Sequence, residues 1–252
     1  MLFRSDDPDS HQGTTLKGIA QRVARLAGYT YAGSYDAASH RPEDGRLYFV
    51  PADTLTGVDS ARQLGISGLD DLLGGVVPHA FIATKAISHG LVAPDAAAPP
   101  GWNHGFAARL GAHVLPGFTA FSLDEASRAG RAMLRDGKVR VKEPCGIGGL
   151  GQQVVANEAE LDRALQSLDA DRVAREGVVL ERNLDDVITF SVGQIQIGDL
   201  CASYCGTQDV TPDNTGRKVY GGSTLRVVRG NCDAHPWPLT RSEEHTSELQ
   251  SH

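Results

Sequence analysis

The amino-acid sequence predicts a mixed α/β protein, of the α/β or α+β class, with a small N-terminal α/β unit and a larger second part. Three observations predict this. A length of 252 residues suits one large domain or two small ones. Helix-like and strand-like patterns alternate over residues 1–83. Farther along, a glycine-rich loop separates two strand-like runs, which predicts a β-hairpin within residues 139–155.

The N-terminal unit begins with a helix. Apolar residues recur at helical spacing from Leu16 to Ala27, with Thr14 or Thr15 as the N-cap and Gly28 at the end. The remaining runs of this unit predict, in order, a strand at 29–35, a strand at 47–50 and a short helix at 64–73 that ends at Gly74-Gly75.

The second part, residues 84–240, contains two capping boxes that predict helix starts, Ser122 with Glu125 and Asn157 with Glu160. An Ala- and Pro-rich loop precedes them. The predicted elements, in order, are a strand at 113–118, a helix at 123–135, a half-buried strand at 138–142, a strand at 152–155, a helix at 161–168, strands at 178–181, 190–197 and 200–204, and a hairpin over 217–229 that turns at Gly221-Gly222.

Composition and charge exclude several classes of protein. Hydrophobic residues make up 40% of the chain and charged residues 22%, which is ordinary for a globular protein. No apolar run approaches the roughly 18 residues needed to span a bilayer, and the polar N-terminus is unlike a signal peptide. A net charge of −7 disfavours nucleic acid as a partner. Four cysteines make no disulfide framework, so we expect a cytoplasmic protein without membrane partners.

The glycine-rich loop is the most informative motif. Gly146, Gly148, Gly149 and Gly151 let backbone N–H groups approach a phosphate without interference from Cβ atoms. The spacing also matches the dinucleotide fingerprint, but a strand-like run rather than a helix follows, which disfavours a Rossmann dehydrogenase. No Lys-Ser or Lys-Thr follows the glycines, so the P-loop pattern fails as well. A surface hairpin without a ligand is the alternative interpretation.

In this arrangement the sequence resembles the ATP-grasp superfamily. Lys142 stands on a strand just before the glycine-rich loop, a helix follows, and the next apolar strand ends in Glu181. An earlier lysine, Lys85, matches the one that reaches the phosphates. The resemblance covers roughly residues 80–205. More narrowly, the chain is similar to an uncharacterised bacterial ATP-grasp-like family of unknown function, which carries stretches like those at 46–55, 74–79 and 220–223.

The resemblance implies an incomplete ATP-grasp-like domain at 84–240 behind a pre-grasp domain at 1–83. It implies ATP and Mg²⁺ as cofactors, and an ATP-dependent ligase that joins an unidentified small-molecule carboxylate to an amine or thiol through an acyl phosphate. A non-catalytic nucleotide-binding or interaction module is the alternative. The cofactor-binding residues it implies are Lys85, Lys142, Gly146, Gly148, Gly149, Gly151, Glu181, Leu184 and Asp186. It assigns no catalytic residue or metal ligand.

One departure from the superfamily concerns the acidic residue that usually binds the ribose hydroxyls. In the best register Thr189 takes its place, with Asp185 or Asp186 as substitutes. The late carboxylates that bind metal are also missing before Thr240.

Residues 241–252 resemble a translated DNA-sequencing adapter, so we set them aside as an artefactual tail. We therefore expect the natural chain to continue past Thr240, and we expect this fragment to be inactive as a ligase.

Each candidate has a plainer interpretation. Lys142 can lie on the solvated face of its strand, Lys85 can be a surface lysine, and Glu181 can be an ordinary strand-end carboxylate. Cys145 is reactive only if nearby cations lower its pKa, and incidental packing is the alternative. Cys201 and Cys205 suit buried thiols, and the histidines, among them His79, His89, His104 and His113, lack metal-ligand spacing.

Overall fold

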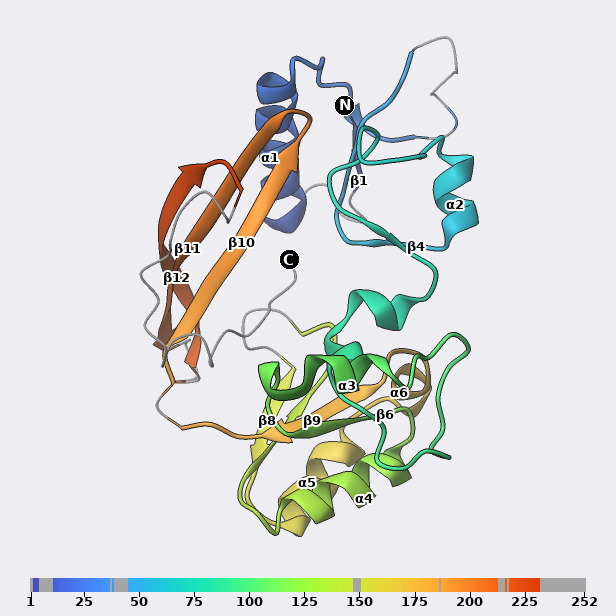
Figure 1. Ribbon diagram of the computed structural model, residues 1–252, viewed down its shortest axis with the longest axis vertical. Coiled ribbons are helices and arrows are strands. Elements are labelled where there is room, and N and C mark those ends of the chain that lie inside the picture. The colour runs from blue at the N-terminus through green and yellow to red at the C-terminus, as the bar shows by residue number, and fades with distance from the viewer. Residues whose placement is uncertain are drawn as a thin grey trace. The chain divides into compact units, whose positions relative to one another are not determined.

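The protein is described by a computed structural model that covers residues 2–4, 11–36, 38, 45–146, 151–185, 187–212, 216 and 218–231. It forms two compact units (Figure 1). Unit 1 comprises Met1–His79, Gln194–Ser203 and Arg229–Asn231, and unit 2 comprises Ala80–Gly193, Tyr204–Val228 and Cys232–His252. Within the described ranges, no helix is long and apolar enough to cross a bilayer. The expected tail at 241–252 lies outside the described residues.

Unit 1 packs one long helix against short parallel strands. Helix α1 (His11–Ala27) buries Ala20, Val23 and Ala24 in a cluster with Tyr48 and Val50. Strands β1 (Leu2–Arg4), β2 (Gly33–Ser34) and β3 (Phe49–Pro51) form a parallel sheet in the order β2-β1-β3. The helix ends before Gly28, at φ +72°, as predicted, but it begins earlier than the predicted threonine cap. The predicted strand at 29–35 shrinks to β2.

The prediction of a helix at 64–73 is wrong. Helix α2 lies earlier, at Val58–Gln63, and the following residues turn around the buried carboxylate of Asp71. That carboxylate accepts hydrogen bonds from the Ser67 amide at 2.7 Å, the Gly68 amide at 3.0 Å and Arg46 Nε at 2.7 Å. Backbone amides held by a side chain compete with helix formation. The turn leads into β5 (Val76–Val77), which pairs in parallel with β4 (Leu55–Thr56).

The centre of unit 2 is a four-stranded antiparallel sheet in the order β6-β9-β7-β8. Its strands are β6 (Gly117–Ala120), β7 (Val139–Lys142), β8 (Gln152–Val155) and β9 (Val178–Arg182). Helices α4 (Leu123–Met133) and α5 (Glu158–Gln166) cover one face (Figure 1). Because side chains alternate along a strand, Val139, Val141 and Leu180 enter the core on that face, and their neighbours point to the other.

The hairpin of β7 and β8 confirms the strand predicted after the glycine-rich loop. Both predicted helix caps are present, and the two Glu side chains of the predicted boxes accept from amides of residues other than the N-cap. Asn157 accepts from the Glu160 amide at 3.0 Å, and Glu160 accepts from the Ala156 amide at 2.8 Å. Ser122 accepts from the Glu125 amide at 3.3 Å, but the Glu125 carboxylate accepts from the amide of Ala97.

Several boundaries differ from prediction. The strand predicted at 113–118 begins only at Gly117, after α3 (Phe106–Leu110) and the 3₁₀ helix η4 (Gly111–His113). A further helix, α6 (Ala170–Glu176), was not predicted. Two short 3₁₀ helices, η2 (Ala80–Ala83) and η3 (Lys85–Ser88), open unit 2.

A second sheet has the order β10-β11-β12, with strands at Thr189–Ile197, Leu200–Pro212 and Lys218–Arg229. Strand β12 is continuous, so the hairpin predicted at Gly221-Gly222 is wrong. Gly221 instead allows β12 to approach Thr211 of β11 closely, because an added Cβ on Gly221 would lie 3.0 Å from Thr211 Cβ.

Candidate functional site

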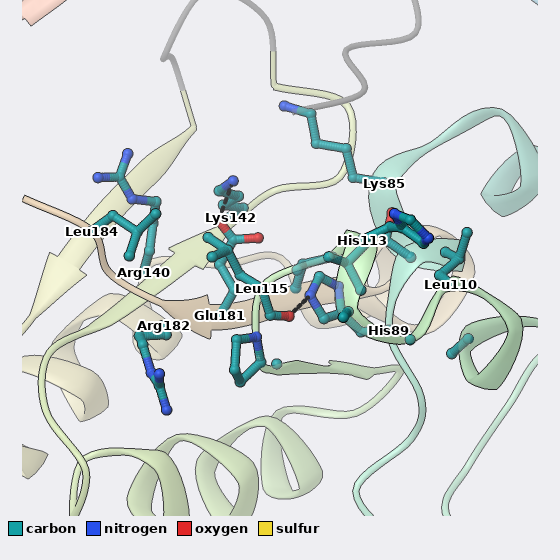
Figure 2. A pocket seen from close by; sticks show the side chains of 18 of the residues that line it. Lys85, His89, Leu110, His113, Leu115, Arg140, Lys142, Glu181, Arg182 and Leu184 are labelled. Atoms are coloured by element: carbon teal, nitrogen blue, oxygen red, sulfur yellow. Dashed lines mark hydrogen bonds and ion pairs between the residues drawn. The ribbon is translucent and has the colours of Figure 1, made fainter. Parts of the chain in front are cut away.

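A cavity of about 680 Å³ lies within unit 2, on the side of the four-stranded sheet away from α4 and α5 (Figure 2). Strands β6, β7 and β9 form its floor, and η3, α3 and η4 contribute to its walls. One wall follows β9 along the chain, through Leu184, Val187 and Ile188. The remaining apolar lining comes from Ala107, Leu110, Ala112, Val114, Leu115, Pro116 and Val179.

The floor holds a buried ion pair between Lys142 Nζ and Glu181 Oε1, with side chains only 5% and 9% exposed. In the strand register Glu181 lies opposite Arg140 on one side and Gly117 on the other. Lys142 faces the cavity because it follows Val141, which enters the core on the opposite face. The alternative that Lys142 lies on a solvated strand face is therefore wrong.

Lys85 lies at the base of the glycine-rich loop, where its Nζ donates to the Gly146 carbonyl at 3.2 Å. The neighbouring sheet fixes the segment that carries it. Thr119 Oγ1 donates to the Ala86 carbonyl at 2.6 Å, and the Thr119 amide donates to the Gly90 carbonyl at 2.9 Å. Two lysines far apart in sequence, Lys85 and Lys142, thus line one cavity beside the loop.

The base of the glycine-rich loop is closed by the Glu143 amide, which donates to the Gly151 carbonyl at 2.8 Å. Gly151 adopts φ +68°, a conformation that favours glycine. Arg172 anchors this base to α6, since it donates to Glu143 at 2.7 Å and to Glu176 at 2.8 Å. Gly148 and Gly149 lie outside the described residues.

Cys145, at the base of the glycine-rich loop, gives no sign of activation. Burial, together with the charge of Glu176, raises the pKa of the Cys145 thiol. The interpretation of Cys145 as incidental packing is favoured. Cys205 is buried and Cys201 half-buried.

The segment after β9 departs from the expected carboxylate arrangement. Asp185 accepts from Asn183 Nδ2 at 3.0 Å and pairs with Lys138 at 3.6 Å, and it does not line the cavity. Thr189 does line it. Asp186 lies outside the described residues. Among the lining residues that the structure describes, Glu181 is the only carboxylate, against Lys85, Arg140, Lys142 and Arg182.

His89 was not predicted as a site residue. It is 5% exposed, and its Nε2 lies 3.0 Å from the Leu115 carbonyl, to which it donates in the neutral form (Figure 2). Its buried Nδ1 has no hydrogen-bond partner among the described residues. Burial lowers the pKa of the imidazole. The ring packs on Gly117, where an added Cβ would lie 2.6 Å from His89 Cδ2.

Comparison with known proteins decides the family. Residues 2–246 match the family described as "Protein of unknown function (DUF3182)". The chain belongs to this family. No curated protein matches the sequence.

Solved structures similar to this DUF3182 protein include two bacterial proteins. D-alanyl-alanine synthetase A from Vibrio cholerae O1 biovar eltor str. N16961 has a TM-score of 0.50 and 13% identity, with 97% of this chain and 76% of that chain covered. D-alanine–D-alanine ligase from Bacillus anthracis has a TM-score of 0.47 and 12% identity, with 92% and 72% covered. At 13% identity the first likeness shows the fold alone, a mixed α/β fold that resembles D-Ala-D-Ala ligase, an ATP-grasp fold. The predicted resemblance to that superfamily is confirmed.

In this DUF3182 protein the cavity brings together Lys85, Lys142, Glu181 and Leu184. Gly146 and Gly151 lie at the loop base beside it. The ligand-binding roles of these residues stay predictions. Chemically, cations beside a glycine-rich loop and an apolar wall suit a ligand with phosphates at one end and a planar apolar group at the other. Among the described residues, no group of three His, Cys, Asp or Glu side chains is placed to hold a metal ion.

Proposed function

We propose that this protein binds ATP in the cavity of unit 2. The observation that carries the proposal is the meeting of Lys85 and Lys142 beside the glycine-rich loop. Two cations and a row of backbone amides neutralise a phosphate chain. The apolar wall of Leu184, Val187 and Ile188 suits the adenine.

The proposed ligand must compete with an existing partner of Lys142. Its ammonium is paired with Glu181 in a nearly buried site. A phosphate oxygen that approaches Lys142 can share the ammonium or replace Glu181, and removing a partner from a buried charge is costly. Lys85 Nζ donates to the Gly146 carbonyl at 3.2 Å, so its ammonium lies at the base of the glycine-rich loop.

The reaction that we propose for the family is ligation of a carboxylate. A carboxylate oxygen attacks the γ-phosphorus, the bond to the bridging oxygen breaks, and ADP leaves. An amine or thiol then attacks the acyl carbon and expels inorganic phosphate, and the nucleophile loses its proton. Lys85 and Lys142 would position the phosphates and offset their charge, which is most of what phosphoryl transfer needs.

Magnesium has no assigned place in this proposal. The described lining offers one carboxylate, Glu181, and Lys142 already pairs with it. Mg²⁺ takes oxygen ligands in octahedral geometry, so this set does not fit the ion and we derive no step through it. The same observation favours a second candidate function, a nucleotide-binding module without catalysis.

Thermal melting with and without Mg-ATP tests the proposal, with Mg-GTP and NAD as comparison ligands. A ligand at 100 times its dissociation constant adds about 2.7 kcal/mol to the free energy of unfolding. We expect a shift with Mg-ATP that Lys85→Met removes and Lys17→Met retains. Lys17 is the matched control, because it is exposed on α1 in unit 1.

No shift with any nucleotide would contradict nucleotide binding. If ATP binds, phosphate release in the presence of mixed carboxylates and amines separates the two candidates. Release that depends on both additions supports the ligase, and binding without release supports the module.

A further inference from the structure

Arg140 is a charged residue of the cavity that neither the glycine-rich motif nor the family resemblance assigns. It lies in the middle of β7, two residues before Lys142 and opposite Glu181 of β9. It lines the cavity near Leu184. In Figure 2, Arg140 and Leu184 lie on one side of the Lys142–Glu181 pair, and Lys85 lies on the other.

The guanidinium of Arg140 is held at three nitrogens. Nε and Nη2 donate to Asn183 Oδ1 at 3.2 and 2.7 Å, and Nη1 donates to Gln152 Oε1 at 3.1 Å. Asn183 is itself held in place. Its backbone amide donates to the Lys138 carbonyl at 3.0 Å, and its side-chain Nδ2 donates to Asp185. The acceptors lie near the guanidinium plane, since N–H donors point along it. The plane is therefore set in advance by β8 and by the segment after β9.

The partners of Arg140 differ in charge from those of the other anchored arginines. Arg46 pairs with Asp71, Arg131 with Asp162, and Arg172 with Glu143. Both acceptors of Arg140 are neutral side-chain amides, and within the described residues no carboxylate forms an ion pair with it. Glu181, opposite in the sheet, is occupied by Lys142. A cation fixed in orientation but not neutralised by the protein suits a contact with a ligand.

We infer that Arg140 binds the base of the nucleotide by stacking its guanidinium plane on the purine ring. This inference rests on the proposed nucleotide site. In that site the phosphate end is defined by Lys85 and Gly146, whereas Arg140 is bonded to Asn183 of the segment that carries Leu184. Most N–H donors at the edge of the guanidinium group are bonded to the Asn183 and Gln152 side chains. A ligand can therefore contact the flat face of the group. A planar guanidinium stacks on aromatic rings, and a lysine ammonium cannot reproduce that plane.

Two ligands, one with a purine base and one without, distinguish contacts to the base from contacts to the phosphates. Binding of ADP and of inorganic tripolyphosphate is measured by calorimetry for the full chain and for Arg140→Met, Arg140→Lys and Lys85→Met. We expect both Arg140 variants to bind ADP roughly tenfold more weakly, since stacking on a desolvated cation is lost or impaired. Tripolyphosphate affinity should stay unchanged in Arg140→Lys, which keeps the charge, and should fall less than ADP affinity in Arg140→Met. Lys85→Met should weaken both ligands, which marks a phosphate contact.

Three results would overturn the inference. Unchanged ADP affinity in both Arg140 variants would remove Arg140 from the site. An equal loss for tripolyphosphate and ADP would make it a phosphate contact. Absence of nucleotide binding by the unaltered protein would overturn the proposed function as well. The first two results would overturn only the role of Arg140. Arg140→Lys keeps the charge and an N–H donor, so it carries the test if Arg140→Met does not fold.

Discussion

At the scale of single residues, the Lys142–Glu181 pair combines a proposed binding role with a cost to stability. Burying two charges removes them from water, and their attraction only partly offsets that loss. The pair is nearly buried at the floor of the cavity. Truncating Lys142 removes the ion-pair partner of the buried Glu181 carboxylate, so such a variant tests folding as much as binding. This is why Lys85 serves as the probe of the proposed phosphate site.

Lys142→Ala should therefore destabilise the protein by about 3–5 kcal/mol in urea unfolding, because Glu181 loses its partner. The double variant Lys142→Met with Glu181→Leu removes both charges and keeps apolar volume. We expect it to unfold within about 1 kcal/mol of the unaltered protein or to be more stable. A loss below about 1 kcal/mol in Lys142→Ala would contradict the burial of the pair.

Asp71 provides the clearest dependence of stability on pH. The hydrogen bonds from Arg46 and from the Ser67 amide hold the pKa of this buried carboxyl well below its usual range. A carboxyl whose pKa is lower in the folded state stabilises the fold above its unfolded pKa of about 3.9. This stabilisation declines as the pH falls below about 5 and through the folded pKa.

Asp71→Asn should cost about 2 kcal/mol or more at pH 7, since charged hydrogen bonds to several donors are weakened. The gap between variant and unaltered protein should narrow at pH 3.5, where the unfolded carboxyl is largely protonated. Urea unfolding at pH 7, 5 and 3.5 measures both effects. Asp59→Asn is the matched control, since that side chain is 89% exposed, and a similar loss there would contradict the assignment.

Individual residues were predictable where a local motif marks them. Lys142 stands beside the glycine-rich loop, and Glu181 ends an apolar strand, so sequence order alone drew attention to both. Arg140 and His89 carry no such signal. Arg140 becomes a cavity residue because β7 pairs with β9, and His89 because β6 brings Gly117 under its ring. Both depend on pairings between segments that are distant in sequence.

At the scale of elements, α4 packs closely against α5 and the sheet at Gly130. An added Cβ on Gly130 of α4 would lie 2.6 Å from Leu161 Cδ2 and 3.1 Å from Leu180 Cδ2. Leu161 and Leu180 are both fully buried, so neither side chain can move aside freely. Gly130 therefore sets the spacing of the helix layer over the sheet.

Gly130→Ala should destabilise the protein by about 1–3 kcal/mol through overpacking, although alanine favours helices. Gly18→Ala in α1 is the matched control, because nothing lies within 4 Å of the new Cβ. That variant should gain up to about 1 kcal/mol from helix propensity. Chemical unfolding of both variants measures the difference, and a stabilised Gly130→Ala would refute close packing at this position.

Element boundaries were predictable where caps are local. The side chains of Ser122 and Asn157 accept from backbone amides three residues on, and both helices begin directly after these predicted caps, α5 three residues before the predicted 161. The segment at 64–73 and strand β12 were mispredicted for a different reason. Asp71 receives a hydrogen bond from Arg46, 25 residues away, and Gly221 approaches Thr211 on a neighbouring strand. Contacts of that range overrode the local pattern.

At the scale of the whole molecule, the described residues form separate hydrophobic clusters in the two units. Ala20, Val23 and Tyr48 belong to a cluster of unit 1, and Val139, Leu161 and Leu180 belong to one of unit 2. The mixed α/β class followed from the alternation of local patterns. The strand order β6-β9-β7-β8 was not predictable, because it joins strands that are distant along the chain.

Exposed apolar side chains recur along the sheet of β10, β11 and β12. Val192, Ile195, Val210, Leu225 and Val227 are 38–63% exposed, on three neighbouring strands. Exposed apolar side chains favour association, and in the part of the chain that the structure describes β10 and β12 are the outer strands of this sheet. The net charge of −7 opposes association near neutral pH.

We therefore expect the protein to self-associate reversibly in sedimentation runs at rising concentration, and more strongly at pH 6 than at pH 8, because the net negative charge is smaller. The double variant Val192→Lys with Val227→Lys places a lysine on each edge strand and should weaken association by roughly tenfold, since lysines oppose pairing at a sheet edge. Leu26→Lys, on a residue of α1 that is 64% exposed, is the matched control. A monomer at every concentration, or an equal effect of the control, would show that this sheet does not drive association.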